Sequence, residues 1–413
     1  MCHRPATRWP ATIRVTGVPV PVFEPAQLGP ITLRNRIIKA ATFEGVMPEG
    51  LVSDKLIDFH RRVASGGVGM TTVAYLAVSP EGRTDKRCIL LRPEARDGLR
   101  RLTDEIHAHG AAAAAQVGHA GPVANSRSNG APSLAPSNGF SPMGTRLRGA
   151  NEHDIDRIIE DYRSAAGLVR EAGFDCIEIH LGHNYLLSSF LSPKLNRRSD
   201  RFGGSLENRA RFARRVVEVV RHAAGDAMAV TAKLNMSDGV PGGLWLDESV
   251  EVARMLEADG FLDALELTGG SSLANPMYLF RGEAPLREFG ATLPPALRLG
   301  FRFFGHRFLP SYPFEEAFFL PYARQFRDAL TMPLILLGGI NRLDTIEHAL
   351  AEDFAFVAMA RALLRQPDLV DRMRAGTSTE SLCIHCNKCM PTIYRGTRCV
   401  LVSHPGAPAA GGN

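Results

Sequence analysis

The sequence predicts an α/β fold, a (β/α)8 TIM barrel in which eight parallel strands alternate with helices. Short apolar, β-branched segments alternate with longer segments of helical periodicity along most of the 413 residues. No internal repeat typical of a solenoid occurs. No Gly-x-Gly-x-x-Gly motif follows a predicted strand, which disfavours the doubly wound sheet, the second fold considered.

The predicted barrel strands are short apolar runs bounded by Gly, Pro or polar turns. They cover residues 34–42, 68–78, 111–117, 176–179, 227–234, 264–267, 333–337 and 354–359. The third run is rich in Ala, and we predict a strand there because it lies between a helix and a Gly-rich loop.

Helices are predicted where apolar residues recur with a period near 3.6. Ser53 is the predicted N-cap of a helix that ends at Gly66-Gly67. The same pattern occurs in residues 94–109, 151–172, 209–224 and 249–259. Residues 121–148 are rich in Gly, Pro, Ser and Asn and are predicted to form a long surface loop.

Composition favours a soluble globular protein, with 45% hydrophobic and 22% charged residues. The net charge of +5 is small and its Lys and Arg are dispersed, so no nucleic-acid-binding surface is indicated. No run of about eighteen apolar residues occurs, so no spanning helix is expected. The first residues lack the apolar core of a secretory signal, and we expect a cytoplasmic location.

The chain divides into three predicted parts. Residues 1–24 form an N-terminal extension, residues 25–375 the barrel, and residues 376–413 a Cys-rich segment with a tail expected to be disordered. Within the barrel, residues 271–330 form a long insertion after strand six, rich in Phe with interleaved basic residues. We weigh a substrate lid and a hydrophobic or homo-oligomer contact equally, with peripheral membrane contact as a third interpretation.

A cluster of hydrogen-bonding side chains follows the fourth predicted strand. His180, His183 and Tyr185 come directly after the run that ends at Ile179. Two imidazoles and a phenol at the carboxyl end of a strand can polarise a carbonyl or supply a proton. The alternative, two structural histidines and a packed tyrosine, has about equal weight from these residues alone.

Longer motifs around this cluster point to a known family. The chain contains, in order, His180-x-x-His183-x-Tyr185, Phe190-Leu191-x-Pro193, Asn196-x-Arg198-x-Asp200 and Gly203-Gly204-Ser205-x-x-Asn208-Arg209. This stretch resembles the old yellow enzyme family of FMN-dependent ene-reductases, including the flavin domain of 2,4-dienoyl-CoA reductases. The resemblance implies that His180 and His183 hold the electron-withdrawing oxygen of the substrate above the flavin. It also implies that Tyr185 protonates the substrate carbon, and that Ser192, Asn196, Arg198, Asp200 and Gly203-Gly204 are scaffold.

A phosphate site is predicted after the last two strands. Gly338 and Gly339 follow strand seven, and Ala360 and Arg361 follow strand eight, at the usual phosphate-binding loops of such barrels. The resemblance adds flavin-ring contacts: Gln116 with the pyrimidine edge, Lys233 near N1 and the C2 carbonyl, and Ala41 and Thr42 beside the ring.

Four cysteines lie close together near the end of the chain, a pattern that favours a metal over a disulfide framework. They are Cys383, Cys386, Cys389 and Cys399. Thiolates at this spacing suit a [4Fe–4S] cluster or a tetrahedral zinc, and reduced free thiols are the remaining alternative. The related dienoyl-CoA reductases carry a similar run for a [4Fe–4S] cluster, followed by a second domain.

The leading functional prediction is an oxidoreductase in which NAD(P)H reduces FMN and FMN passes hydride to an activated alkene. Its substrate is expected to be a small molecule. One alternative is a flavin-free, phosphate-binding lyase or isomerase with Lys233 as a Schiff-base lysine. The other is an electron-transfer protein built on the cysteines, although such a carrier does not need the His180, His183 and Tyr185 cluster.

Overall fold

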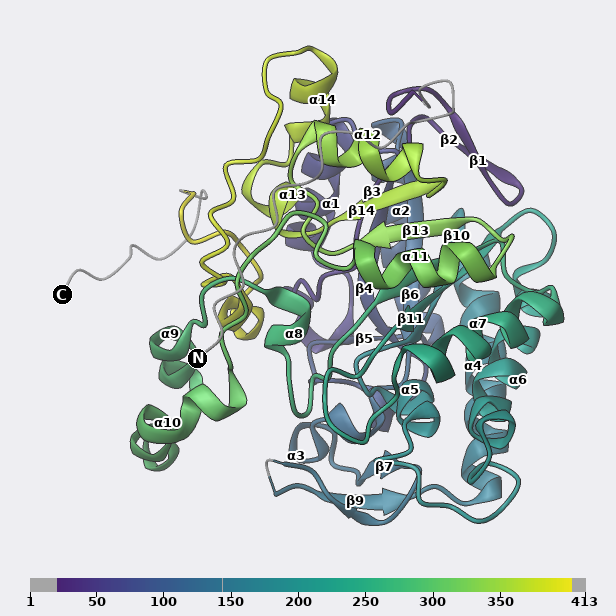
Figure 1. Ribbon diagram of the computed structural model, residues 1–413. Coiled ribbons are helices and arrows are strands. Elements are labelled where there is room, and N and C mark those ends of the chain that lie inside the picture. Colours follow the sequence, from purple (N-terminus) through teal and green to yellow (C-terminus); the bar gives the residue numbers. More distant parts are fainter. Residues whose placement is uncertain (1–20, 143, 403–413) are drawn as a thin grey trace.

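The computed structural model describes residues 21–142 and 144–402. Eight parallel strands close into a barrel, because β3 pairs with β4 on one side and with β14 on the other (Figure 1). Around the barrel they are β3 (Ile37–Lys39), β4 (Met70–Ala77), β6 (Ala112–Gly118), β10 (Cys176–Leu181), β11 (Ala229–Asn235), β12 (Ala264–Thr268), β13 (Leu334–Leu337) and β14 (Phe356–Met359). The predicted fold is confirmed, and each predicted strand overlaps one of these.

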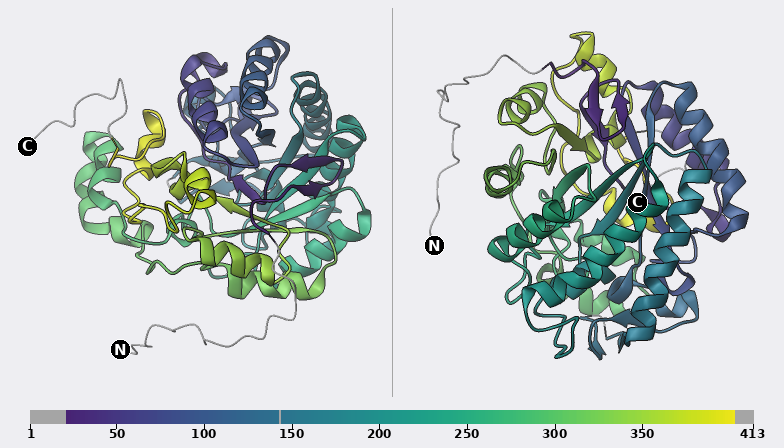
Figure 2. Two further views of the ribbon diagram at one scale, coloured as in Figure 1. Left: turned by 90° about the horizontal axis from the view of Figure 1, so that it is seen from above. Right: turned by 90° about the vertical axis from the view of Figure 1, so that its right-hand side faces the viewer.

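Helices between the strands surround the barrel (Figure 2). They are α1 (Asp54–Ser65), α2 (Arg96–Ala108), α4 (Glu152–Glu171), α6 (Leu206–Ala224), α7 (Leu246–Asp259), α11 (Leu320–Ala329), α12 (Leu343–Ala351), α13 (Arg361–Arg365) and α14 (Leu369–Arg374). Ser53 caps α1 as predicted. Helix α6 begins three residues earlier than predicted, because Ser205 accepts a hydrogen bond from Asn208 N and caps it there. No helix in the described ranges is long and apolar enough to cross a membrane.

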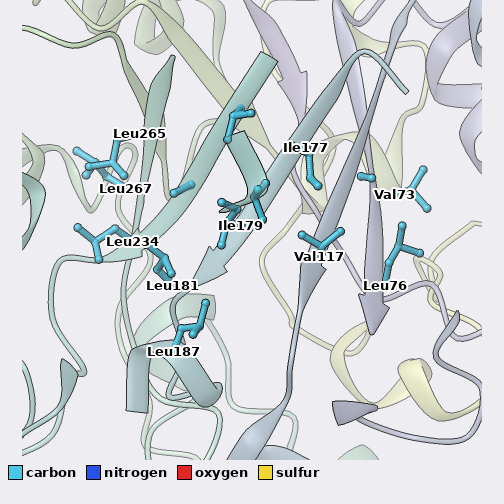
Figure 3. Packing of buried hydrophobic residues seen from close by; sticks show 14 of the residues in the cluster. Val73, Leu76, Val117, Ile177, Ile179, Leu181, Leu187, Leu234, Leu265 and Leu267 are labelled. Atoms are coloured by element: carbon cyan, nitrogen blue, oxygen red, sulfur yellow. The ribbon is translucent and has the colours of Figure 1, made fainter. Parts of the chain in front are cut away.

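Alternate strand residues build two separate apolar layers, as the period of two requires. Outward-facing residues such as Val73, Val117, Ile179, Leu234 and Leu267 pack beneath the helices (Figure 3). Inward-facing residues from all eight strands form a second cluster inside the barrel: Ile38, Met70, Ala114, Cys176, Ala229, Ala264, Ile335 and Phe356.

A short N-terminal hairpin completes the inner cluster. It consists of β1 (Ala26–Leu28) paired antiparallel with β2 (Ile31–Leu33), and Leu28 and Leu33 are fully buried against the inward-facing residues. The amino end of the barrel is therefore filled by apolar side chains, and chemistry is left to the carboxyl end.

Several shorter elements lie in the loops. Residues 121–148, predicted as a loop, contain α3 (Ser126–Asn129) and a small sheet of β7 (Ser133–Ala135), β8 (Gly139–Phe140) and β9 (Arg146–Gly149). These strands are too short to show an alternating pattern in the sequence. Two further short elements are β5 (Ile89–Leu90), which pairs with β4, and α5 (Leu186–Leu191).

The Phe-rich insertion forms three short helices before α11. They are α8 (Met277–Phe280), α9 (Leu286–Thr292) and α10 (Pro295–Phe308), and α9 and α10 project from the barrel (Figure 1). Phe289 packs against Phe301 and Phe308, whereas Phe303 and Phe304 are exposed on α10. Residues 320–329 form α11, which occupies the place of the sixth barrel helix, so the inserted part is shorter than 271–330.

The Cys-rich segment lies against loops at the carboxyl end of the barrel. Thr397 N donates to Glu44 O in the loop after β3, and Ser381 N donates to Asn341 O after β13. Asn387 Nδ2 donates to the carbonyls of Arg281 and Glu283 after β12, both at 3.0 Å. Three barrel loops therefore hold this segment on the face where the site residues lie. The predictions for residues 1–20 and 403–413 fall outside the described residues.

Candidate active site

Strand register directs a polar layer into the barrel above the apolar one. Gln116, Glu178, Lys233 and Glu266 each lie an even number of residues beyond an inward-facing apolar residue of the same strand. The pairing aligns Glu178 with Gln116, and Lys233 with both His180 and Glu266. These side chains from four adjacent strands therefore converge at one level.

Lys233 is a buried ammonium held between two carboxylates. Its Nζ lies 3.4 Å from Glu178 and forms a closer ion pair with Glu266, and all three side chains are almost fully buried. Gln116 Nε2 donates to Glu178 Oε1 at 2.7 Å. Burial and the charge of Glu178 outweigh the attraction of Lys233 and raise the pKa of Glu266 to about 8. Glu266 therefore holds a proton more tightly than an exposed glutamate does.

His180 and His183 form a directional hydrogen-bond chain. Gly182 N–H donates to His180 Nδ1 at 3.0 Å, which places the proton of the neutral ring on Nε2. His180 Nε2 faces His183 Nδ1 at 3.3 Å, and His183 Nε2 lies 3.0 Å from Thr268 Oγ1. Burial first, and then the positive charge of Lys233, lower the pKa of His183 to about 3. Burial, His183 and Lys233 also lower the pKa of His180 well below its ordinary value. Both rings are neutral N–H donors at physiological pH.

The turn after β10 brings His183 back over His180. His183 and Asn184 both have left-handed backbone conformations, with φ near 60°. Asn235 Oδ1 accepts from His183 N at 3.0 Å, and Ser188 Oγ donates to Gly182 O at 2.7 Å. The side chain of Asn235 is itself held by Asp238 Oδ1 at 2.9 Å. A conformation that non-glycine residues rarely adopt is therefore fixed by buried polar contacts from β11 and α5.

Tyr185 is stacked on His180. Their ring centroids are 4.4 Å apart with an interplanar angle of 11°, and the buried Tyr75 meets Tyr185 edge-on at 5.2 Å. Burial first, with a smaller contribution from Cys88, raises the pKa of Tyr185 above that of a free phenol. The phenol therefore keeps its proton at neutral pH, as a general acid must before it reacts.

Ala41 and Thr42 lie at the carboxyl end of β3. Lys39 points outward from the barrel and donates to Thr42 Oγ1 at 2.9 Å and to Glu44 at 3.2 Å. The hydroxyl of Thr42 accepts from Lys39, which leaves its own proton for another acceptor. The contact of Ala41 and Thr42 with the flavin ring stays a prediction.

The predicted phosphate residues have other partners in this structure. A Cβ added at Gly338 would come within 2.5 Å of the Phe319 ring, and one at Gly339 within 2.7 Å of Phe318. The partly buried Arg361 donates to Arg281 O at 3.0 Å and also to Asn387 Oδ1. The two glycines therefore lie under the Phe-rich insertion, and Arg361 faces the Cys-rich segment. Phosphate binding by Gly338, Gly339, Ala360 and Arg361 stays a prediction.

Four residues of the site were not predicted from the sequence. Glu178, Glu266, Thr268 and Asn235 are all buried on barrel strands. Each lies an even number of residues from an inward-facing residue of its strand. Polar residues at alternate positions of apolar strands were therefore the signal that could have identified them.

The four cysteines of the Cys-rich segment lie around one cavity. Cys383, Cys386, Cys389 and Cys399 line one small cavity together with Arg361. Within residues 21–142 and 144–402, no three His, Cys, Asp or Glu residues form a group that could hold one metal ion. None of the four forms a disulfide.

Comparison with known proteins identifies the family. The sequence pattern of the NADH:flavin oxidoreductase / NADH oxidase family matches residues 21–264, more than half of the chain. The chain belongs to this family. The NADH:flavin oxidoreductase family accounts for FMN and NAD(P)H as cofactors, and it supports the predicted oxidoreductase activity.

Relatives differ in length. The chain is 63% identical over 389 residues to the 4,4'-dithiodibutanoate disulfide reductase of Rhodococcus erythropolis, which covers 94% of this chain and 96% of that protein. It is 32% identical over 382 residues to a metal reductase of Desulforamulus reducens, covering 91% of this chain but only 52% of that protein.

Solved structures of the same fold support the barrel. A 2-naphthoyl-CoA reductase complex aligns with a TM-score of 0.75 at 24% identity, over 89% of this chain and 54% of that one. An old yellow enzyme homologue from Zymomonas mobilis aligns with a TM-score of 0.69 at 20% identity, over 88% of this chain and 95% of that one.

The surroundings of Lys233 do not suit the alternative function, a flavin-free lyase or isomerase with Lys233 as a Schiff-base lysine. The carboxylates of Glu178 and Glu266 outweigh burial and raise the pKa of Lys233. A Schiff-base lysine requires a lowered pKa so that its amine is free to react. Lys233 is instead a fixed positive charge.

Removal of the Thr268 hydroxyl should weaken ligand binding by the histidine pair. A ligand oxygen that accepts from both rings requires the proton of His183 on Nδ1, and Thr268 can then donate to Nε2. A phenol, whose oxygen can accept from the two histidines, serves as the probe ligand. We expect Thr268→Val to weaken phenol binding by roughly five- to a hundredfold, the usual effect of an unpaired buried polar atom. Titration of the phenol charge-transfer band measures this, and Thr268→Ser, which keeps the hydroxyl, is the matched control. Unchanged phenol affinity in Thr268→Val would contradict the role.

Glu266 should make stability depend on pH. Its raised pKa means that the folded state binds a proton more tightly than the unfolded state, so its contribution is full below about pH 4.5 and is lost as the pH rises towards 8. Glu266→Gln keeps an uncharged group with a donor and an acceptor. The free energy of unfolding of this variant should therefore rise relative to wild type between pH 5 and 8, by up to about 1.4 kcal/mol per pH unit. Urea unfolding at fixed FMN concentration measures it, and a difference constant with pH would refute the assignment.

Proposed function

We propose that this protein uses FMN and NAD(P)H to reduce a small organic disulfide that carries carboxylate groups. The observation that carries the proposal is the 63% identity, over nearly the full length of both chains, to a protein named 4,4'-dithiodibutanoate disulfide reductase. The buried donors at the carboxyl end of the barrel supply the groups that such a reaction needs.

The residues of the polar layer fit a bound flavin ring. Gln116 offers an amide and Lys233 a fixed positive charge at the level where the ring would lie, and Thr42 has a hydroxyl proton to donate. When bound and reduced, FMN supplies the hydride. We propose Gly338, Gly339, Ala360 and Arg361 for its phosphate, because they follow the last two barrel strands.

His180, His183 and Tyr185 would act on the acceptor. The two neutral imidazoles orient it and stabilise negative charge as it develops. In disulfide reduction, one sulfur receives the hydride while the S–S bond breaks. The other sulfur leaves as a thiolate and takes the proton of Tyr185, so that two thiols form. Solvent then returns a proton to Tyr185.

Reduction of an activated alkene is the second candidate function. The stacked His180 and Tyr185, with His183 at hydrogen-bond distance, favour it. In this reaction the imidazoles bind the carbonyl oxygen, the β-carbon receives the hydride, and Tyr185 protonates the α-carbon. Both candidates assign the same roles to the same three side chains.

We also propose that Cys383, Cys386, Cys389 and Cys399 hold a [4Fe–4S] cluster, with a structural zinc ion as the alternative. The four side chains line one cavity. Four thiolates are the complete protein ligand set of a [4Fe–4S] cluster, and they also suit a tetrahedral zinc ion. Such a cluster would lie beside Arg361.

Tyr185→Phe should separate the two half-reactions. Hydride transfer from nicotinamide to flavin needs no acid, so flavin reduction should stay close to wild type. Reoxidation by the acceptor should slow by roughly a hundredfold or more, the scale of a lost general acid. Stopped-flow traces with 4,4'-dithiodibutanoate and with 2-cyclohexenone measure this step for each candidate. Reoxidation at the wild-type rate with both acceptors would mean that another group is the acid.

Metal analysis should identify the cysteine-bound group. Anaerobically purified protein is expected to contain about four irons per chain, with an electron paramagnetic resonance signal after reduction. Cys386→Ser should lose that iron but retain FMN. About one zinc per chain without iron would instead make the segment a zinc-stabilised clip.

A further inference from the structure

Arg281 lies in a cage of aromatic rings after β12. Its guanidinium carbon is 4.8 Å from the centroid of the Phe318 ring, 5.5 Å from that of Tyr278, 5.8 Å from that of Tyr312 and 6.0 Å from that of Phe319. Aromatic faces attract a cation and hold a flat guanidinium in place, but they do not use its N–H donors.

The donors of this guanidinium have no partner among the described residues. Arg281 Nε is buried without a hydrogen-bond acceptor, and no ion pair or hydrogen bond of the side chain occurs in residues 21–142 and 144–402. By contrast, the buried Lys233 and Arg209 are both paired with Glu side chains. A half-buried cation with free donors is a place where an anion binds favourably, because the cost of removing the charge from water is already part of the fold.

The cage lies at the carboxyl end of the barrel, beside the histidine pair. A Cβ added at Gly269 would lie 3.2 Å from both the Phe319 and the Tyr278 rings, and Phe319 also covers Gly338. Gly269 directly follows Thr268, the residue that contacts His183. The cage therefore begins one residue from the hydrogen-bond chain of the site.

The backbone of Arg281 is fixed. Its carbonyl accepts from both Arg361 Nη1 and Asn387 Nδ2 at 3.0 Å, and its N–H donates to Met277 O at 3.0 Å. Its φ of 35° is one that non-glycine residues rarely adopt. The side chain is therefore aimed by contacts from α13 and from the Cys-rich segment.

We propose that Arg281 is a carboxylate-binding subsite of the active site, which holds the acid end of an acceptor whose reactive bond lies at His180, His183 and Tyr185. This inference rests on the proposed reduction of a carboxylate-bearing acceptor. A guanidinium presents two parallel N–H donors that match the two oxygens of a carboxylate, and the rings shield that pair from water. Arg281 would thus select acidic acceptors over neutral ones with the same reactive bond.

The experiment compares a charged and an uncharged acceptor in three forms of the FMN-loaded protein. The acceptors are 4,4'-dithiodibutanoate and its dimethyl ester, and the proteins are wild type, Arg281→Gln and Arg281→Lys. Steady-state kinetics gives kcat and KM. Perturbation of the flavin absorbance gives the affinity of the oxidised protein for each compound without turnover, and fluorescence of released FMN gives the flavin affinity.

We expect Arg281→Gln to raise the KM and the dissociation constant of the diacid by about tenfold or more, the scale of a lost charge-assisted hydrogen bond. Values for the ester and the affinity for FMN should stay near wild type. Arg281→Lys keeps the charge but not the paired donors, and should lie between the two. The lysine variant also controls for a general disturbance of the cage.

Each other outcome rejects a specific statement. Loss of FMN affinity in Arg281→Gln, with unchanged preference for the diacid, would assign Arg281 to the flavin phosphate and overturn the subsite. An equal loss of affinity for the diacid and for the ester would mean that Arg281 has only a structural role. Wild-type protein that binds the diacid more tightly than the ester but reduces neither would reject the proposed function and leave the subsite standing.

Discussion

Burial of one ammonium group inside the barrel constrains the structure at the carboxyl end of its strands. A Lys side chain removed from water is stable only when it is paired and hydrogen-bonded, because the loss of hydration is large. Lys233 meets this requirement by contacts with Glu178 on β10 and Glu266 on β12, and Glu178 in turn holds Gln116 on β6. Four neighbouring strands are thereby linked by side chains in addition to their backbone ladder.

The same buried charge contributes to the protonation of the histidines above it. Lys233 contributes to lowering the pKa of both His180 and His183, although burial is the larger cause. Neutral imidazoles donate hydrogen bonds without competing for a proton. Burial raises the pKa of Tyr185, so this phenol keeps its proton, as the proposed reaction requires.

The sequence predicted the barrel well because a barrel depends on local signals. Seven of the eight barrel strands were found from short apolar runs and the Ala-rich third from its position, and the predicted cap at Ser53 begins a helix in the structure. The cluster of His180, His183 and Tyr185 could be predicted because its members are close in sequence. By contrast, Glu178 and Glu266 are 88 positions apart and meet only through strand register, which no local pattern contains. The small sheet of β7, β8 and β9 was missed because its strands are shorter than one recognisable alternation.

The Cys-rich segment and the Phe-rich insertion are also distant in sequence but share one backbone group. Arg361 at the start of α13 and Asn387 from between two cysteines both donate to the carbonyl of Arg281, and Arg361 also donates to Asn387. A displacement of any one of the three would remove hydrogen bonds from the other two. Because the Asn387 side chain is buried and Arg361 is partly buried, those bonds would not be replaced easily by water. The position of the Arg281 guanidinium over the carboxyl end of the barrel is therefore coupled to the conformation of the loop that carries the cysteines.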